Sequence, residues 1–192
     1  MKKFLALLGL AVAVVNTTYA AETGVITQEM QLRLLTATIA PLDLINWKVG
    51  ETAQYDIKAG SFGKLGTSTK SVTKDEGAAI WVTQQMNLMV QNQKIEMLLN
   101  KADGKVLKML VNGKEQQIPD DEIEVISQDY VDVTVPAGTF KAIHIVAKSK
   151  QAPKLEVWAN PRDTVMDGTL KQIVQTQGID LTMELTSFRR VN

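Results

Sequence analysis

The chain has 192 residues with 21 basic and 21 acidic side chains, and it contains no cysteine. This length allows one domain with a sizeable core, and the missing cysteine excludes disulfides, thiol catalysis and cysteine metal sites. The balanced charge, without a basic stripe, argues against nucleic-acid binding, and the 5% aromatic content argues against a carbohydrate-binding surface, which usually displays several rings.

The first twenty residues have the order of a secretory signal peptide. A charged start from Met1 to Lys3 precedes an apolar run from Phe4 to Val15, and a polar stretch then ends in the small residue Ala20. That order is typical of a cleavable export signal, and the apolar run is shorter than the about 20 residues that a membrane-spanning helix needs. We therefore expect residues 1–20 to be removed after Ala20. The mature protein should be periplasmic, with secretion as the alternative, and peripheral rather than integral to the membrane.

Residues 21–46 are predicted to form an N-terminal helical segment. Thr27 can cap a helix, because its side-chain oxygen accepts hydrogen bonds from the free N–H groups of the first turn, and Met30 and Leu34 follow at helical spacing. The alternation of Leu32 and Leu34 also fits a strand. We expect the helical segment to pack over the rest of the chain and to share one globular domain with it.

From residue 47 to residue 192 the pattern changes to an alternation of period two with frequent turns, which is typical of antiparallel strands. Asp103-Gly104 and Asn112-Gly113 fit tight hairpin turns, because these residue pairs accept positive φ. Strands at near-regular spacing, about nine to ten of them, predict a mainly β fold in the form of an antiparallel incomplete barrel, or half-barrel. The expected strands span residues 52–58, 67–73, 78–90, 94–100, 106–111, 129–135, 140–147, 154–159, 170–175 and 181–190.

Several of these strands carry apolar residues on both faces, as in the run from Met97 to Leu99. A sheet with one wet face should alternate cleanly, so either both faces are covered or one of them lines an apolar hollow. A helix supplied by residues 27–45 would explain the first arrangement, and a ligand cavity in an open barrel would explain the second. Methionine suits both, since it fills gaps and adapts to varied apolar ligands. The candidate residues that line an apolar site are Trp81, Met86, Met89, Met97, Leu99 and Met109.

No pattern for catalysis or metal binding is found. His144 is the only histidine, and the chain lacks both a GxSxG elbow and an HExxH motif. His144 fits a packed or half-exposed strand residue. The acidic run Asp120-Asp121-Glu122 lacks the spacing of a calcium loop and fits a solvated loop. Asp129 and Asp132 lie three apart in a strand, so they face opposite ways. We therefore predict a protein that is not an enzyme and needs no cofactor or metal.

The stretch from Val133 to Ala142, with the pattern V-PAGTF-A, resembles a hairpin in a family of uncharacterised exported bacterial proteins. Trp47 to Glu51 upstream, Glu156 to Trp158 downstream and the closing strand Leu181 to Phe188 extend the resemblance over about residues 47–188. The wider group looks like the lipoprotein carriers LolA and LolB. The resemblance implies an incompletely closed barrel with helices over its opening, which holds acyl chains in an apolar hollow.

Together these features predict a periplasmic, non-enzymatic binding or carrier-like protein that holds an acyl or lipoprotein-like ligand in an open β-barrel. The alternative is a structural or interaction protein of the cell envelope, with a protein partner and no small ligand. An unrecognised hydrolase has the least support.

Overall fold

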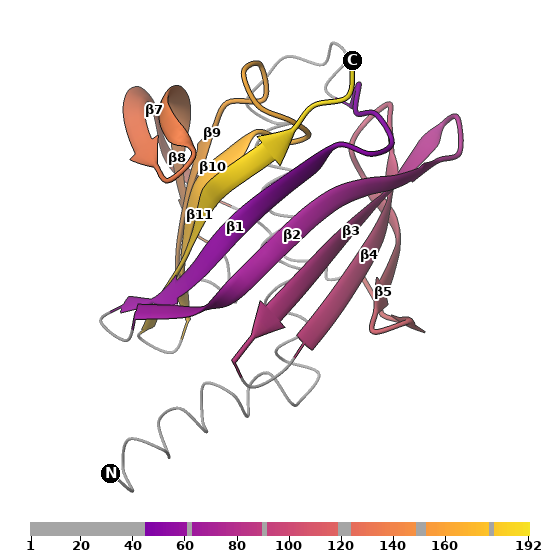
Figure 1. Cartoon of the computed structure of the whole chain (residues 1–192), viewed down its shortest axis with the longest axis horizontal. Coiled ribbons are helices and arrows are strands. Elements are labelled where there is room, and N and C mark those ends of the chain that lie inside the picture. Colours follow the sequence, from indigo (N-terminus) through magenta and orange to yellow (C-terminus); the bar gives the residue numbers. More distant parts are fainter. Residues whose placement is uncertain (1–44, 61–62, 90–91, 119–123, 149–152, 177–178) are drawn as a thin grey trace, which may run out of the picture.

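The computed structural model describes residues 45–60, 63–89, 92–118, 124–148, 153–176 and 179–192. All secondary-structure elements of this part of the chain are strands, and they form one 11-stranded antiparallel sheet (Figure 1). The strands are β1 (Thr52–Ala59), β2 (Gly63–Asp75), β3 (Ala79–Leu88), β4 (Asn92–Asn100), β5 (Val106–Val111), β6 (Lys114–Glu115), β7 (Glu124–Val135), β8 (Gly138–Lys148), β9 (Lys154–Ala159), β10 (Thr169–Thr176) and β11 (Ile179–Arg189).

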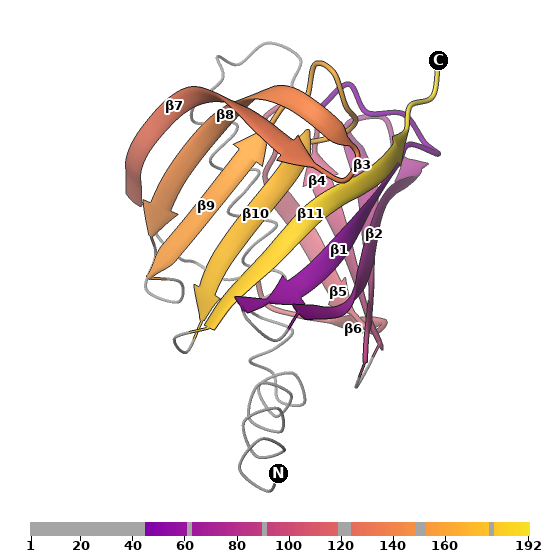
Figure 2. The same cartoon turned by 60° about the vertical axis from the view of Figure 1, so that its left-hand side comes forward.

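The sheet consists of two meanders, β1 to β6 and β7 to β11, which meet where β1 pairs with β11. The strand order is β6-β5-β4-β3-β2-β1-β11-β10-β9-β8-β7, so β6 and β7 are the two edges. The sheet is curved, and its edge strands are not paired with each other (Figure 2). The predicted mainly β fold with an incomplete barrel is therefore confirmed. The count of nine to ten strands is too low, because the two-residue strand β6 has no detectable sequence pattern.

The predicted tight turn at Asn112-Gly113 is confirmed. At Asp103-Gly104 only the glycine has a positive φ, and the pair lies in the longer connection 101–105 between β4 and β5. Asn112 and Gly113 have φ values of 51° and 78°, and they join Val111 to its partner Lys114. Positive φ at both central residues matches the twist of a tight hairpin, which is why this position needs Asn-Gly. The V-PAGTF-A stretch forms the β7–β8 hairpin, in which Val135 pairs with Gly138.

β2 begins at Gly63, four residues before the predicted start. The first four residues of β2 include two glycines, Gly63 and Gly66. Glycine has no side chain to alternate between the faces, so the period-two pattern does not reveal this part of the strand. The structure gives Gly66 a specific reason, because a Cβ added there would overlap the backbone oxygen of Asn87 on β3. The close approach of the two backbones therefore requires glycine at this position.

The strand register assigns each residue to one of two faces. The row Ile145, Val157, Gln172, Met183 and Ile57 crosses β8, β9, β10, β11 and β1. We call the face that carries this row the inner face, and the opposite one the outer face. The smaller of two core clusters lies on the inner face of β8, β9 and β10 and consists of Ile145, Ala147, Leu155, Val157, Ala159 and Val174.

The predicted signal peptide, its cleavage after Ala20 and the predicted helical segment up to residue 44 lie outside the described residues, as does the acidic run at 120–122. Their boundaries stay predictions. No helix within the described part of the chain combines the length and the apolarity that crossing a bilayer requires.

Gly66→Ala should lower the free energy of unfolding by about 1–3 kcal/mol, because the new methyl group forces β2 and β3 apart. Urea unfolding followed by circular dichroism would measure the loss. Thr67→Ser, at the exposed neighbouring position of β2, is the matched control and should change stability by less than about 0.5 kcal/mol. Equal unfolding midpoints for the two variants would contradict the steric explanation.

Candidate functional site

Four of the six candidate lining residues lie on the inner face of β3, β4 and β5. Met97 pairs with Val82 on one side and with Met109 on the other, and the inner face also carries Met86 and Leu99. The exposed fractions of Met86, Met97, Leu99 and Met109 are 9%, 0%, 0% and 2%. We call these four residues the methionine patch. The structure thus brings together the larger part of the set that the sequence singled out.

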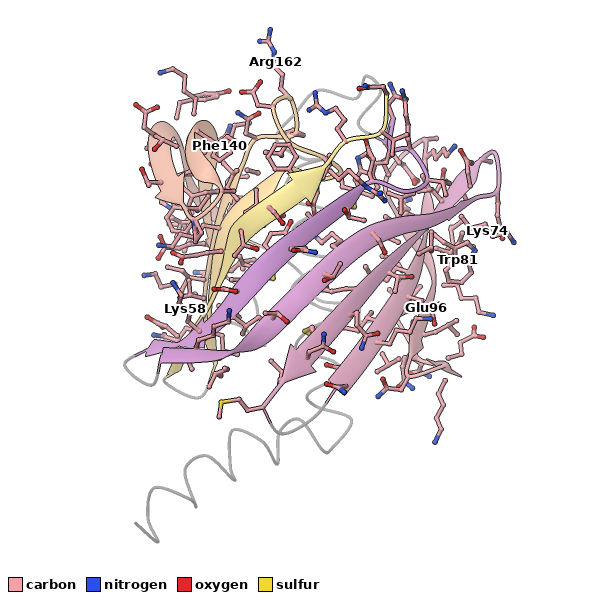
Figure 3. All side chains as sticks on the ribbon, viewed as in Figure 1. Lys58, Lys74, Trp81, Glu96, Phe140 and Arg162 are labelled. Carbon is pink, nitrogen blue, oxygen red and sulfur yellow. The ribbon has the colours of Figure 1, made fainter. Side chains whose placement is uncertain are left out.

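The structure places Trp81 and Met89 elsewhere. Trp81 pairs with Leu98 on the outer face, where its indole Nε1 donates to Glu76 Oε1 at 3.0 Å, and Figure 3 shows its ring directed away from the sheet. Met89 follows the end of β3 and is 77% exposed. Because successive residues of a strand point to opposite faces, Trp81 and Met86 cannot share one.

A buried ion pair on the inner face was missed by the sequence analysis. Lys70 Nζ lies 2.6 Å from Asp167 Oδ2, and the two side chains are 1% and 2% exposed. Asp167 Oδ1 accepts a hydrogen bond from Thr169 Oγ1 at 3.0 Å, and the Tyr55 hydroxyl donates to Thr169 O at 3.3 Å. We call Tyr55, Lys70, Asp167 and Thr169 the Lys70 cluster. The sequence does contain one signal for it: Lys70 stands two residues before Val72, which is buried, and residues two apart in a strand lie on the same face.

The loop from residue 160 to residue 168 holds Asp167 in place. Asn160 Nδ2 donates to Lys141 O on β8 at 2.8 Å, and Arg190, after β11, donates from Nε to Thr164 O at 3.1 Å. Gly168 has a φ of 70°, and a Cβ there would overlap the backbone of Asn160. The position of the buried carboxylate is therefore fixed by β8, by the C-terminal residues and by a glycine.

The surroundings of Tyr55 in the Lys70 cluster change the pKa of its hydroxyl group. Burial raises the pKa of Tyr55 well above its ordinary value, and the Asp167 carboxylate raises it further. The hydroxyl therefore stays protonated and remains a donor to Thr169.

Two further polar residues on the inner face satisfy each other. Ser68 and Gln84 are 1% and 5% exposed, and Gln84 Nε2 donates to Ser68 Oγ at 3.0 Å. The same nitrogen lies 4.0 Å from Met183 Sδ. Because a buried polar group is costly only when it lacks a partner, this pair leaves the surrounding inner face suitable for apolar contacts.

His144 belongs to a row of stacked and charged groups on the outer face. Its ring stacks on Trp158, with 4.2 Å between the centroids and 8° between the planes, and its Nε2 lies 3.0 Å from Glu156 Oε2. Desolvation raises the pKa of Glu156, but hydrogen bonds from Lys154 and His144 outweigh it and hold the pKa below its ordinary value. His144 is thus a half-buried strand residue. Within the described residues, no three His, Asp or Glu side chains gather around a point that could hold a metal ion.

Comparisons with known proteins give structural similarities only. No protein-family model matches the chain, and no curated protein matches it. A protein of Parabacteroides distasonis ATCC 8503 assigned as a lipoprotein is similar over 79% of this chain and 100% of its own, with 8% identity and a TM-score of 0.47. An exported protein of Bacteroides fragilis NCTC 9343 with a YmcC-like fold is similar over 75% and 97%, with 11% identity and a TM-score of 0.47. MucB is similar over 79% and 57%, with 10% identity and a TM-score of 0.41.

With TM-scores below 0.5, none of these similarities bears on the ligand or the partner of this chain. These similarities do not confirm the resemblance to LolA and LolB. It therefore stays a prediction from the sequence.

Lys70→Met should lower the free energy of unfolding by about 3–5 kcal/mol, because it leaves the Asp167 carboxylate buried without a counter-charge. The double variant Lys70→Met/Asp167→Leu should recover a large part of this loss, since no charge then stays buried. Urea unfolding would measure both. Lys74 lies on the same strand as Lys70 and forms an exposed ion pair with Glu76. Lys74→Met breaks that pair and should have little effect on stability. If the double variant were as unstable as Lys70→Met alone, the unpaired Asp167 carboxylate would not be the cause of the loss.

Tyr55 should make stability fall as the pH rises above about 10, the ordinary pKa of tyrosine. The unfolded chain releases the phenol proton there, whereas the folded protein retains it, so alkali favours unfolding. Unfolding free energies measured at increasing alkaline pH should show this loss in the wild type and much less of it in Tyr55→Phe. Tyr130→Phe, at a position that is 80% exposed, should leave the wild-type profile unchanged. Identical profiles for all three proteins would refute the prediction.

Proposed function

We propose that this chain is a periplasmic, non-enzymatic binding or carrier-like protein. It holds an apolar ligand, either a free acyl chain or the lipid portion of a lipoprotein, against the inner face of its open sheet. The export signal in the sequence supports the location. The apolar inner face supports the ligand class.

One observation carries the proposal. Buried apolar side chains line the inner face in both meanders, as two separate clusters, of which the larger includes the methionine patch. The described residues supply no α-helix as a second layer. A sheet that is apolar on one face has to bury that face against something. In an open barrel this covering layer includes the ligand.

The character of the inner face favours an unbranched, flexible ligand. Met97 and Met109 lie side by side across β4 and β5, and methionine side chains adjust to ligands of varied shape. Gln84 is already paired with Ser68, so this pair does not call for a polar ligand group. An acyl chain fits this environment.

Replacing Met97 by tryptophan should separate a ligand site from a packed core. If the methionine patch faces an acyl chain, Met97→Trp fills the space and should weaken binding of a fluorescent fatty acid by about tenfold or more, while the melting temperature changes little. A fully packed core instead loses about 1–3 kcal/mol on overpacking. Fluorescence titration and thermal unfolding of the same samples would measure both quantities.

Two control variants come from the remaining predicted residues. Met89→Trp adds the same ring at an exposed position, and Trp81→Phe alters the outer face, so both should bind the fatty acid as the wild type does. Native mass spectrometry of the protein purified without detergent should show a bound lipid mass. The absence of both a bound lipid and any titratable fatty-acid binding would refute the proposed function.

A further inference from the structure

β7 is a long edge strand whose first half is uncovered. It pairs with β8 alone, and its seven residues from Glu124 to Tyr130 are all exposed. Six large apolar side chains of the described residues are exposed, and three of them lie here: Val125 at 43%, Ile126 at 57% and Tyr130 at 80%. We call residues 124–130 the β7 edge segment. Soluble proteins usually keep edge strands short, charged or covered, because an open edge is a template for another strand.

The β7 edge segment continues the apolar inner face. Val125 pairs with Ala147 and Tyr130 pairs with Ile143. Ala147 belongs to the smaller core cluster, and Ile143 packs against it. A strand added beside β7 would therefore place its own apolar side chains next to Val125 and Tyr130, at the distance at which cross-strand pairs stabilise a sheet.

The charge of β7 indicates the chemistry of the added strand. β7 carries three carboxylates, on Glu124, Asp129 and Asp132, and no basic residue. Glu124 and Asp132 stay 67% and 68% exposed although each has a lysine of β8 within 4 Å. Asp129 forms no ion pair with any of the described side chains. A strand that bears lysine or arginine is complementary to this edge.

The same charges disfavour a second copy of this chain. Pairing of β7 with β7 of another molecule would bring two sets of these three carboxylates together, without a basic side chain on either strand. Like charges on adjoining strands destabilise the pair. The occupant therefore has to be a different polypeptide segment.

We infer that the β7 edge segment binds an extended, basic polypeptide segment, which joins the sheet as a further strand. Its main-chain groups bond to the free edge of β7, as in other cases of strand addition. An apolar residue lies opposite Tyr130 on the inner face, and a basic residue lies opposite Asp129 on the outer face. The inference goes beyond the proposed function, because it uses the edge of the sheet and not the apolar ligand of the inner face.

A labelled peptide of alternating lysine and valine, about ten residues long to match a strand, is the probe. Its binding to the purified full chain is followed by fluorescence anisotropy. Asp129→Lys should weaken binding about threefold to tenfold through loss of charge complementarity. Tyr130→Pro should weaken it by about tenfold or more, because proline removes a main-chain donor and obstructs the edge. A peptide with glutamate in place of lysine should bind Asp129→Lys better than it binds the wild type.

Matched controls separate strand addition from unspecific attraction. Asp103→Lys makes the same charge change in the β4–β5 turn, and Leu107→Ser removes another exposed apolar side chain; both should bind the peptide as the wild type does. Equal weakening by Asp129→Lys and Asp103→Lys would overturn the inference, as would the absence of peptide binding. A dimer seen in sedimentation that Asp129→Lys strengthens or Tyr130→Pro disperses would also overturn it, since the occupant would then be a second copy. If Tyr130→Pro fails to fold, the comparison of Asp129→Lys with Asp103→Lys decides the outcome.

Discussion

The ion pair between Lys70 and Asp167 is the constraint on which the arrangement of the two meanders depends. Lys70 belongs to β2 in the first meander, and Asp167 lies two residues before β10 in the second. Their charged atoms are 2.6 Å apart, and both side chains are buried. Moving two charges out of water costs several kcal/mol per ion, and their attraction offsets this only when further hydrogen bonds complete the site. Thr169 supplies such bonds, because its Oγ1 and its main-chain N–H both donate to Asp167 Oδ1. A slip of β2 by one residue would turn Lys70 to the outer face and leave Asp167 alone, so the pair selects a single register.

The same pair decides what the inner face can do. Because Lys70, Asp167 and the nearby Gln84 are satisfied by neighbours within the protein, the inner face has polar atoms at its centre without a demand for polar ligand groups there. The methionine patch and the smaller core cluster lie on the two sides of this centre, one in each meander. An elongated apolar ligand would contact both meanders at once, and its binding would then add to the connections that the β1–β11 pairing and the Lys70–Asp167 ion pair make between them.

Much of the fold followed from the sequence because the signals were local. Alternation in β3 to β5 and turn residues such as Asn112 and Gly113 depend only on neighbouring residues. The start of β7 was missed, because a strand exposed on both faces has no buried side to alternate with. The candidate site mixed two faces, because Trp81 stands one residue from Val82 and therefore lies on the outer face. Lys70 was missed because a long-range partner, Asp167, cannot be read from local pattern.

The two edges of the open sheet differ in a way that bears on how the protein works. β6 has two residues, Lys114 and Glu115, both charged and exposed, which is how soluble proteins commonly make an edge unattractive to other strands. β7 has twelve residues, and its exposed half carries Val125, Ile126 and Tyr130. A bulge between Val125 and Ser127 is its only interruption along the β8 pairing. An open barrel has two edge strands. Here β6 is protected by charge, whereas the exposed apolar side chains of β7 lower the solubility of the protein. The asymmetry is accounted for if β6 serves only to end the sheet and β7 serves to extend it.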